Sequence, residues 1–367
     1  MYDFIIAGAG LYGAVMAYEA QKKGYKCLVI EKREHTGGNI YCREIAGIHV
    51  HYYGAHIFHT GNETIWNYVN QFVQFNHYVN SPIACYQGKL YNLPFNMNTF
   101  YQLWGTLTPT EAMSEINRQR NKYQTAHARN LEEMALSLVG EDIYYTLIKG
   151  YTEKQWGKPA SEIPAFIIQR IPLRFTFNNN YFDDPYQGIP IGGYNQLINA
   201  LLEGTEVRLN TDFLSDRESY LQQARKVIYT GEIDRYFAYC LGRLEYRSLH
   251  FEHELLHTES NYQGNAVINY TDAEVPYTRI LEHKHFEFGE QQSTVISREY
   301  STEFREGTDP YYPINDEQNE HLYIKYKQLA AKDSRLHFGG RLGAYRYYNM
   351  DQVIEAALND FKIISGQ

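Results

Sequence analysis

The sequence predicts an α/β fold in which a Rossmann-like domain is interrupted by an inserted helical lobe and by an antiparallel β-sheet lobe. Three observations support this prediction. The chain opens with a strand, a glycine-rich turn, a helix and a second strand; its middle third carries helix-capping signals; and a later third alternates polar and apolar residues. With 367 residues, it has room for two or three domains.

The N-terminal unit has the order that binds dinucleotides. An apolar strand over 2–7 enters the turn Gly8-Ala9-Gly10-Leu11-Tyr12-Gly13, and we expect a helix over 14–23 and a strand over 26–30. Gly8 permits the tight turn, Gly10 lets the backbone approach a pyrophosphate, and Gly13 lets helix and strand pack closely. The start of the helix offers free N–H groups to phosphates.

Three further features bear on the cofactor, and the second and third of them favour FAD over NAD. Glu31 ends the second strand, where it can accept hydrogen bonds from an adenosine ribose. The basic and then glycine-rich loop 32–39 suits an extended cofactor, and 336–341 reads as a strand that delivers two glycines and Arg341 to the same pyrophosphate. Taken alone, the pair Gly339-Gly340 is equally well explained as an ordinary strand-to-loop turn. The three features together predict an FAD-binding Rossmann-like domain.

Composition argues against several classes of protein. The net charge of −9 disfavours a nucleic-acid binder, and no apolar run approaches a membrane span. Four scattered cysteines predict neither a disulfide framework nor a zinc site, and the first strand begins at once, without a secretory signal. We therefore expect a cytoplasmic protein. The 35 tyrosines suit a cleft for a nucleotide sugar, although most of them are expected at the surface.

After the N-terminal unit we expect strands around a turn at Gln87-Gly88, helices that begin at the capping residues Thr108 and Asn130, and a helix over 141–149 stopped by Gly150. Strand-like sequence follows over 166–190, then a helix after Gly193 and strands at 207–209 and 226–231. An antiparallel sheet is expected over 236–312 and a helix over 318–330. The predicted FAD-binding domain comprises 1–76, 190–235 and 315–367. The helical lobe is 95–165, and the sheet lobe comprises 77–94, 166–189 and 236–314.

Arginines and aromatic residues gather between these lobes. Arg170 and Arg174 follow the helical lobe, and Arg279 lies in the expected sheet. Two arginines together can grip a pyrophosphate, although a single arginine is more often an exposed ion-pair partner. The polar segment 151–158 has an aromatic residue near each end, which suits a mobile lid or a plain connector.

His56 and His59 have no acidic or cysteine partner at ligand spacing, so no metal site is expected. A histidine beside a flavin ring is the favoured alternative for His56.

Several long strings of residues resemble bacterial UDP-galactopyranose mutase, a family of flavoenzymes. They are 53–60, 92–100, 150–157, 170–172, 178–182, 186–190 and 275–279, and the resemblance runs from the first strand to Tyr347-Tyr348. It implies an enzyme that interconverts UDP-galactopyranose and UDP-galactofuranose without net redox change. In the family, reduced flavin N5 attacks the anomeric carbon, and the sugar ring opens and recloses on that adduct. The resemblance also implies a homodimer and a role in cell-surface polysaccharide synthesis.

The resemblance further implies roles for individual residues. Arg170 and Arg279 would grip the diphosphate, Tyr151 would stack on uracil, and Trp156 would lie on the lid near the sugar. Further substrate ligands would be Tyr181, Arg247, Asn269, Tyr312 and Tyr347. His56 would lie beside the flavin ring. The other cofactor ligands would be Gly8, Gly10, Gly13, Glu31, Lys32, Arg33, Gly38, Asn39, Arg341 and Tyr348.

The sequence departs from the family at Asn349, where the family commonly has aspartate, and the lost carboxylate removes a charge near the site. Three alternatives stay open. They are a mutase acting on the 2-acetamido sugar UDP-GalNAc, a conventional FAD oxidoreductase, and a catalytically dead nucleotide-sugar-binding protein. The oxidoreductase would leave the arginines without a role.

Overall fold

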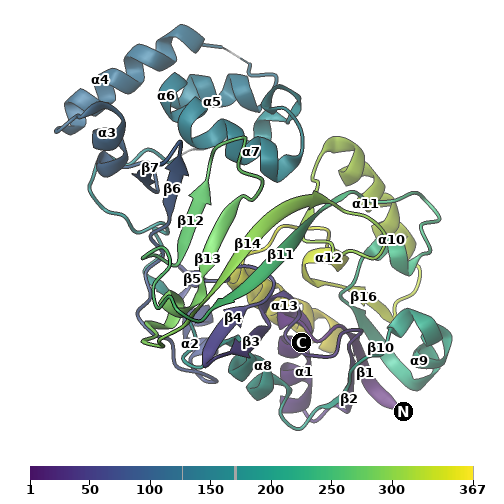
Figure 1. Ribbon diagram of the computed structural model, residues 1–367. Helices are drawn as coiled ribbons and strands as arrows, with labels where there is room; N and C mark the ends of the chain where they lie inside the picture. Colours follow the sequence, from purple (N-terminus) through teal and green to yellow (C-terminus); the bar gives the residue numbers. More distant parts are fainter. Residues whose placement is uncertain (126, 169–171, 367) are drawn as a thin grey trace.

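The computed structural model describes residues 1–125, 127–168 and 172–366. Two large sheets, two small strand pairs and a helical lobe make up the described part of the molecule, and both termini lie beside the smaller of the two large sheets (Figure 1). The long strands of the larger sheet cross the middle of the molecule and separate the helical lobe from the smaller sheet (Figure 1).

The smaller sheet has five strands, all parallel, and confirms the Rossmann-like prediction. Its order is β16 (Leu336–Phe338), β10 (Ala224–Tyr229), β1 (Tyr2–Ala7), β2 (Cys27–Ile30) and β9 (Glu206–Arg208). Alternate residues of β1 face opposite cores, because successive side chains of a strand point to opposite faces. Phe4 and Ile6 pack with α1 (Leu11–Lys22), α8 (Tyr194–Leu202) and α13 (Met350–Ser365), while Ile5 and Ala7 pack towards α9 (Arg217–Gln223).

The larger sheet has seven strands and is mixed rather than purely antiparallel, because β12 and β6 pair in parallel. Its order is β15 (Tyr312–Pro313), β11 (Tyr246–Leu256), β14 (Thr294–Glu303), β13 (Arg279–Glu282), β12 (Val267–Tyr270), β6 (Ile83–Tyr86) and β7 (Lys89–Asn92). Two small antiparallel pairs lie outside it: the hairpin of β3 (Cys42–Ile45) and β4 (Ile48–His51), and the non-local pair of β5 (Phe58–Thr60) and β8 (Tyr186–Gly188).

The helical lobe begins as its capping residues predict. Thr108 accepts a hydrogen bond from the Glu111 amide at the start of α4, and Asn130 accepts one from Glu133 at the start of α5. Its helices are α3 (Met97–Trp104), α4 (Pro109–Arg120), α5 (Leu131–Val139), α6 (Glu141–Ile143) and α7 (Lys149–Trp156). The remaining helices are α2 (Glu63–Val69), α10 (Ile233–Tyr236), α11 (Glu317–Ala330) and α12 (Gly340–Gly343).

Three local predictions are wrong. The segment 151–158 is mostly helix α7, which ends at left-handed Gly157, and not a loop. Gly150 does not stop a helix; it lies inside α7, where it packs against another segment. Within the described part of 166–190, the only strand is β8, and the chain there is otherwise irregular.

No helix in the described residues has both the length and the apolar character needed to span a membrane.

Candidate functional site

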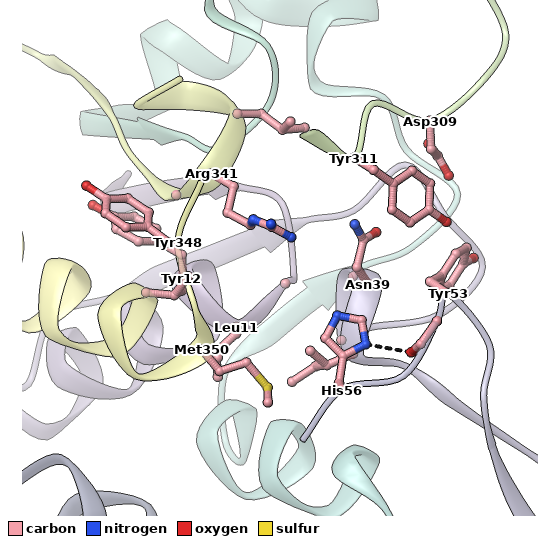
Figure 2. A pocket seen from close by; sticks show the side chains of 18 of the residues that line it. Leu11, Tyr12, Asn39, Tyr53, His56, Asp309, Tyr311, Arg341, Tyr348 and Met350 are labelled. Carbon is pink, nitrogen blue, oxygen red and sulfur yellow. Dashed lines mark hydrogen bonds between the residues drawn. The ribbon is translucent and has the colours of Figure 1, made fainter. Parts of the chain in front are cut away.

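A cavity of about 490 Å³ lies between the carboxyl ends of the parallel strands and the larger sheet. Its lining comes from the β1–α1 turn, the loop after β2, the segment 53–59, β12, β13 and the C-terminal segment 340–353. In Figure 2, Arg341 reaches into the pocket from one side, with Asn39 and His56 on the other side and Met350 below. Ligands bind in this crevice in open α/β sheets.

The glycine-rich turn is built for close backbone approach. A Cβ on Gly13 would lie 2.0 Å from the Gly8 carbonyl oxygen, and one on Gly38 would lie 3.0 Å from the Gly10 Cα. The two glycine segments are further joined by a hydrogen bond from the Gly37 amide to the Ala9 carbonyl at 2.8 Å. Since Gly10 is the residue before α1 and has no side chain to cap it, the helix presents its N–H groups to the cavity.

Glu31 is buried at the adenosine end that the Rossmann arrangement predicts. Its carboxylate accepts hydrogen bonds from the Ala9 amide at 2.8 Å and from the Arg33 amide at 2.9 Å. Each oxygen keeps a further lone pair, because a carboxylate has about four acceptor positions. Glu31 therefore fixes the glycine turn as well as lining the cavity, and its contact with a ribose stays a prediction.

Arg33 closes the same end of the cavity. Its guanidinium donates to Asp309 at 2.7 Å and to Asn39 at 3.2 Å, and it lies over the ring of Tyr53 at 4.3 Å. Asp309 comes from the loop between β14 and β15, so the contact joins the two sheets across the cavity mouth. Figure 2 shows Tyr53, Asp309 and Tyr311 side by side at this rim.

His56 is held as a neutral ring with one defined tautomer. Its Nδ1 lies 2.7 Å from the Gly54 carbonyl oxygen, and because a carbonyl only accepts, Nδ1 carries the proton. Burial lowers the pKa of His56 to about 4, so Nε2 is a free acceptor at neutral pH. The His56 amide in turn donates to Nδ1 of His51, whose pKa burial lowers to about 3.

Arg279 opens β13 and reaches the cavity as a fixed cation. Its Nε and Nη2 contact Glu299 on the neighbouring strand β14 at 2.8 and 2.7 Å. Burial alone would lower the pKa of Arg279, but the Glu299 carboxylate holds it above its ordinary value. The charge is thus permanent, and the ion pair sets the direction of the guanidinium.

Arg341 supplies a second cation among tyrosines. Its guanidinium lies 4.6 Å from the ring centre of Tyr347 and 5.7 Å from that of Tyr312. Its Nε is buried and has no hydrogen-bond partner among the described residues. An unsatisfied charged donor inside a cavity calls for an acceptor such as a phosphate oxygen. Together with the glycine cradle, this donor fits a bound dinucleotide.

The structure brings most of the predicted site residues to this one cavity. The predicted cofactor ligands that line it are Gly8, Gly10, Gly13, Glu31, Lys32, Arg33, Gly38, Asn39, His56, Arg341 and Tyr348. The predicted substrate ligands that line it are Tyr151, Tyr181, Asn269, Arg279, Tyr312 and Tyr347. Asn349, where the family commonly has aspartate, also lines it. Their individual roles stay predictions.

Three predicted residues are not in this group. Arg170 lies outside the described residues. Trp156 and Arg247 line a neighbouring cleft instead, where Trp156 packs on the core of the helical lobe. Arg247 donates from Nε to the Gln155 carbonyl at 3.0 Å and from Nη2 to Ser301 at 3.0 Å, so it holds the end of α7 and does not reach the central cavity.

Asn80 is a site residue that the sequence did not predict. It is buried and lines the cavity, and its Oδ1 has no hydrogen-bond partner within the described chain. The same holds for Oδ1 of Asn269, so the cavity presents two unsatisfied amide acceptors to a ligand. Asn80 lies just before the Pro82 that precedes β6, and nothing local distinguishes it from a turn asparagine.

The described residues contain no group of three His, Cys, Asp or Glu side chains able to hold a metal ion.

Comparison with known proteins defines the family. A family model described as UDP-galactopyranose mutase matches residues 146–347, and one described as an NAD(P)-binding Rossmann-like domain matches residues 6–72. A protein of Klebsiella pneumoniae named "Probable UDP-galactopyranose mutase" is 41% identical over 97% of this chain and 93% of its own length. The chain belongs to the UDP-galactopyranose mutase family. The chain is therefore an enzyme of a mutase family, and mutases are isomerases.

Further relatives and solved structures also resemble this chain. The dTDP-fucopyranose mutase of Escherichia coli is 38% identical over 98% of this chain and 97% of its own length. A crystal structure of reduced UDP-galactopyranose mutase superposes with a TM-score of 0.74 at 14% identity, covering 100% of this chain and 96% of the other. A putrescine oxidase gives 0.59 at 12% identity, covering 100% of this chain and 99% of the other. These likenesses to solved structures show the shared fold.

Proposed function

We propose that this protein interconverts UDP-galactopyranose and UDP-galactofuranose on reduced FAD, with no net redox change. The observation that carries the proposal is the meeting of Arg279, Arg341 and the glycine cradle in one cavity, in a chain of this family. One part of the cavity suits the pyrophosphate of a dinucleotide, and the arginines and tyrosines suit a second diphosphate. The product would supply galactofuranose for cell-surface polysaccharide.

The residues of the chain would bind and stabilise charge, because the described cavity holds no activated serine or cysteine nucleophile. When bound and reduced, FAD supplies the nucleophile for the anomeric carbon. Arg279 is held in place by Glu299 and would stabilise negative charge on the departing UDP. Tyr151 lines the cavity from α7 and offers its ring to uracil. Neutral His56 would accept a hydrogen bond beside the flavin.

A dTDP-fucose substrate is the second candidate, because a relative of nearly equal identity is named dTDP-fucopyranose mutase. The 2-acetamido sugar is a third. Both keep the diphosphate and the sugar ring on which the Arg279 and Arg341 arrangement would act, so the same site chemistry would serve all three.

Several broader features belong to the proposal. The FAD-binding domain is taken as 1–76, 190–235 and 315–367. The helical lobe is 95–165, and the sheet lobe is made of 77–94, 166–189 and 236–314. A cytoplasmic location suits the four cysteines, which are all free in the described chain. A homodimer is supported by exposed apolar side chains on neighbouring elements, namely Leu90 on β7, Tyr101 on α3, Leu107 in the loop between α3 and α4, and Met113 on α4.

The test measures turnover with three furanose substrates, UDP-galactofuranose, its 2-acetamido analogue and dTDP-fucofuranose, each with and without dithionite. Conversion of UDP-galactofuranose to the pyranose only under reducing conditions is expected. Faster conversion of dTDP-fucofuranose would replace the substrate assignment, and consumption of oxygen or NAD(P)H with no interconversion of furanose and pyranose would overturn the mutase proposal. Light scattering of the purified enzyme tests the dimer.

A further inference from the structure

The cavity receives residues from two segments that are far apart in the sequence. Helix α7 contributes Tyr151, while β12 and β13 contribute Asn269 and Arg279. A diphosphate clamp and a ring-stacking residue act on one ligand only if the two segments keep a constant separation. That separation depends on the contacts that hold α7 on the β12–β13 loop.

Lys154 makes the most extensive of these contacts. Its ammonium donates to three backbone carbonyls, Tyr270 at 2.7 Å, Val275 at 2.9 Å and Tyr277 at 3.0 Å. An ammonium has three donors and no acceptor, so every hydrogen of Lys154 is used. The three carbonyls span the whole β12–β13 connection, from the last residue of β12 to two residues before Arg279.

A second contact lies one turn earlier in α7. Gly150 is buried, and a Cβ there would lie 2.2 Å from the Thr271 carbonyl oxygen. Thr271 also donates from its hydroxyl to the Thr146 carbonyl at 2.7 Å, in the π-helical segment Tyr144–Ile148 that leads into α7. The helix backbone therefore touches the loop directly at a position where only glycine fits.

The other end of α7 is tied to the same sheet. Arg247 and Ser301 both donate to the Gln155 carbonyl, at 3.0 and 2.5 Å. A cation at the end of a helix is favoured by the helix dipole. Lys154 is thus the central one of three attachments, and it does not line the cavity itself.

We propose that Lys154 is a positioning residue, which fixes Tyr151 relative to Asn269 and Arg279 by holding α7 on the β12–β13 loop. The inference rests on the proposed function, since it assigns Tyr151 and Arg279 to one nucleotide ligand. Lysine suits this role better than arginine, because its three donors diverge from one point, whereas the guanidinium is a planar fork.

The test compares Lys154→Met with the purified wild-type holoenzyme. Methionine keeps the length of the side chain and removes the three donors. The matched control is Lys158→Met, since Lys158 is exposed, lies just beyond the same helix and makes none of these contacts. The measurements are the Kd for UDP by calorimetry, the flavin content, and amide hydrogen exchange over 149–156.

We expect Lys154→Met to raise the Kd for UDP at least tenfold and to speed exchange in α7, with flavin content unchanged. Lys158→Met should match wild type in all three. A Kd within twofold of wild type would overturn the positioning role, whereas failure of wild type to bind UDP would instead overturn the proposed function. If Lys154→Met does not fold, Lys154→Arg serves in its place: a rise of a few fold in Kd is expected, and an unchanged Kd overturns the proposal.

Discussion

Asp309 and Arg33 join the two sheets at the mouth of the cavity, with 2.7 Å between Oδ2 of the carboxylate and Nη2 of the guanidinium. Lys32 adds a second cation at 3.4 Å from the same carboxylate. Asp309 belongs to the β14–β15 loop and Arg33 to the loop after β2, so the pair bridges parts of the chain that share no strand. This bridge covers the adenosine end of the proposed cofactor site.

Replacing Asp309 by asparagine should therefore weaken cofactor retention. Loss of a partly exposed ion pair costs about 1 kcal/mol, which is roughly fivefold in affinity. Release of flavin on dilution, followed by its fluorescence, measures the effect. Glu254→Gln is the control, because it removes the partner of Arg298 on the exposed part of the sheet. Equal release rates in the two variants would show that the bridge does not retain the cofactor.

Arg279→Lys should lower turnover by roughly 10²-fold, because a lysine cannot contact Glu299 and a diphosphate with the same fork of donors. Flavin content should stay at the wild-type level, since Arg279 is assigned to the substrate. The control is Arg298→Lys, which changes the residue before Glu299 on β14 and should leave turnover unaltered. Steady-state kinetics on UDP-galactofuranose separate the two variants, and similar losses in both would remove the special role of Arg279.

Acid should destabilise the protein through its buried histidines. The pKa values of His56 and His51 are lowered by burial to about 4 and about 3, below the ordinary value near 6.5. Above pH 6.5 both histidines are mostly neutral in the folded chain and in the unfolded chain. As the pH falls below 6.5, the unfolded chain binds protons that the folded chain does not, so stability is lost down to the folded pKa values.

The expected loss between pH 6.5 and pH 5 is about 2 kcal/mol for each of these histidines. Urea unfolding of the holoenzyme across this range measures the slope of stability against pH. His51→Asn removes one of the titrating groups and should make the slope shallower by about one proton. A slope identical to that of wild type would mean that His51 is not neutral in the folded protein.

Two glycine substitutions should fail in different ways. Gly13→Ala places a methyl group against the Gly8 carbonyl, so we expect it to lower both Tm and flavin content. A Cβ on Gly10 meets only the Gly38 Cα at 3.8 Å, so Gly10→Ala should fold normally and lose flavin alone. Differential scanning calorimetry with and without added FAD distinguishes the two. Equal melting temperatures would contradict the packing assigned to Gly13.

Features that depend on residues close together in the sequence could be predicted, whereas features that depend on tertiary contacts could not. The glycine turn and the caps at Thr108 and Asn130 were predictable because each depends on residues a few positions apart. The prediction that Gly150 stops a helix is wrong, because the reason for a glycine there is the Thr271 carbonyl, which only the tertiary fold brings near. Arg247 was expected at the substrate, yet its guanidinium contacts Gln155 and Ser301 instead. The residues that contact Gly150 and Arg247 lie far from them in the sequence, so these contacts cannot be predicted from the neighbouring residues.

The order of strands in the parallel sheet has a consequence for biosynthesis. Strand β16 pairs with β10 beside β1, and Arg341 follows β16 within a few residues. The glycine turn after β1 is therefore synthesised long before β16 can complete its sheet. Such non-local pairing slows folding. A nascent chain stalled before β16 should not yet hold flavin, so the cofactor would enter only after β16 has been synthesised.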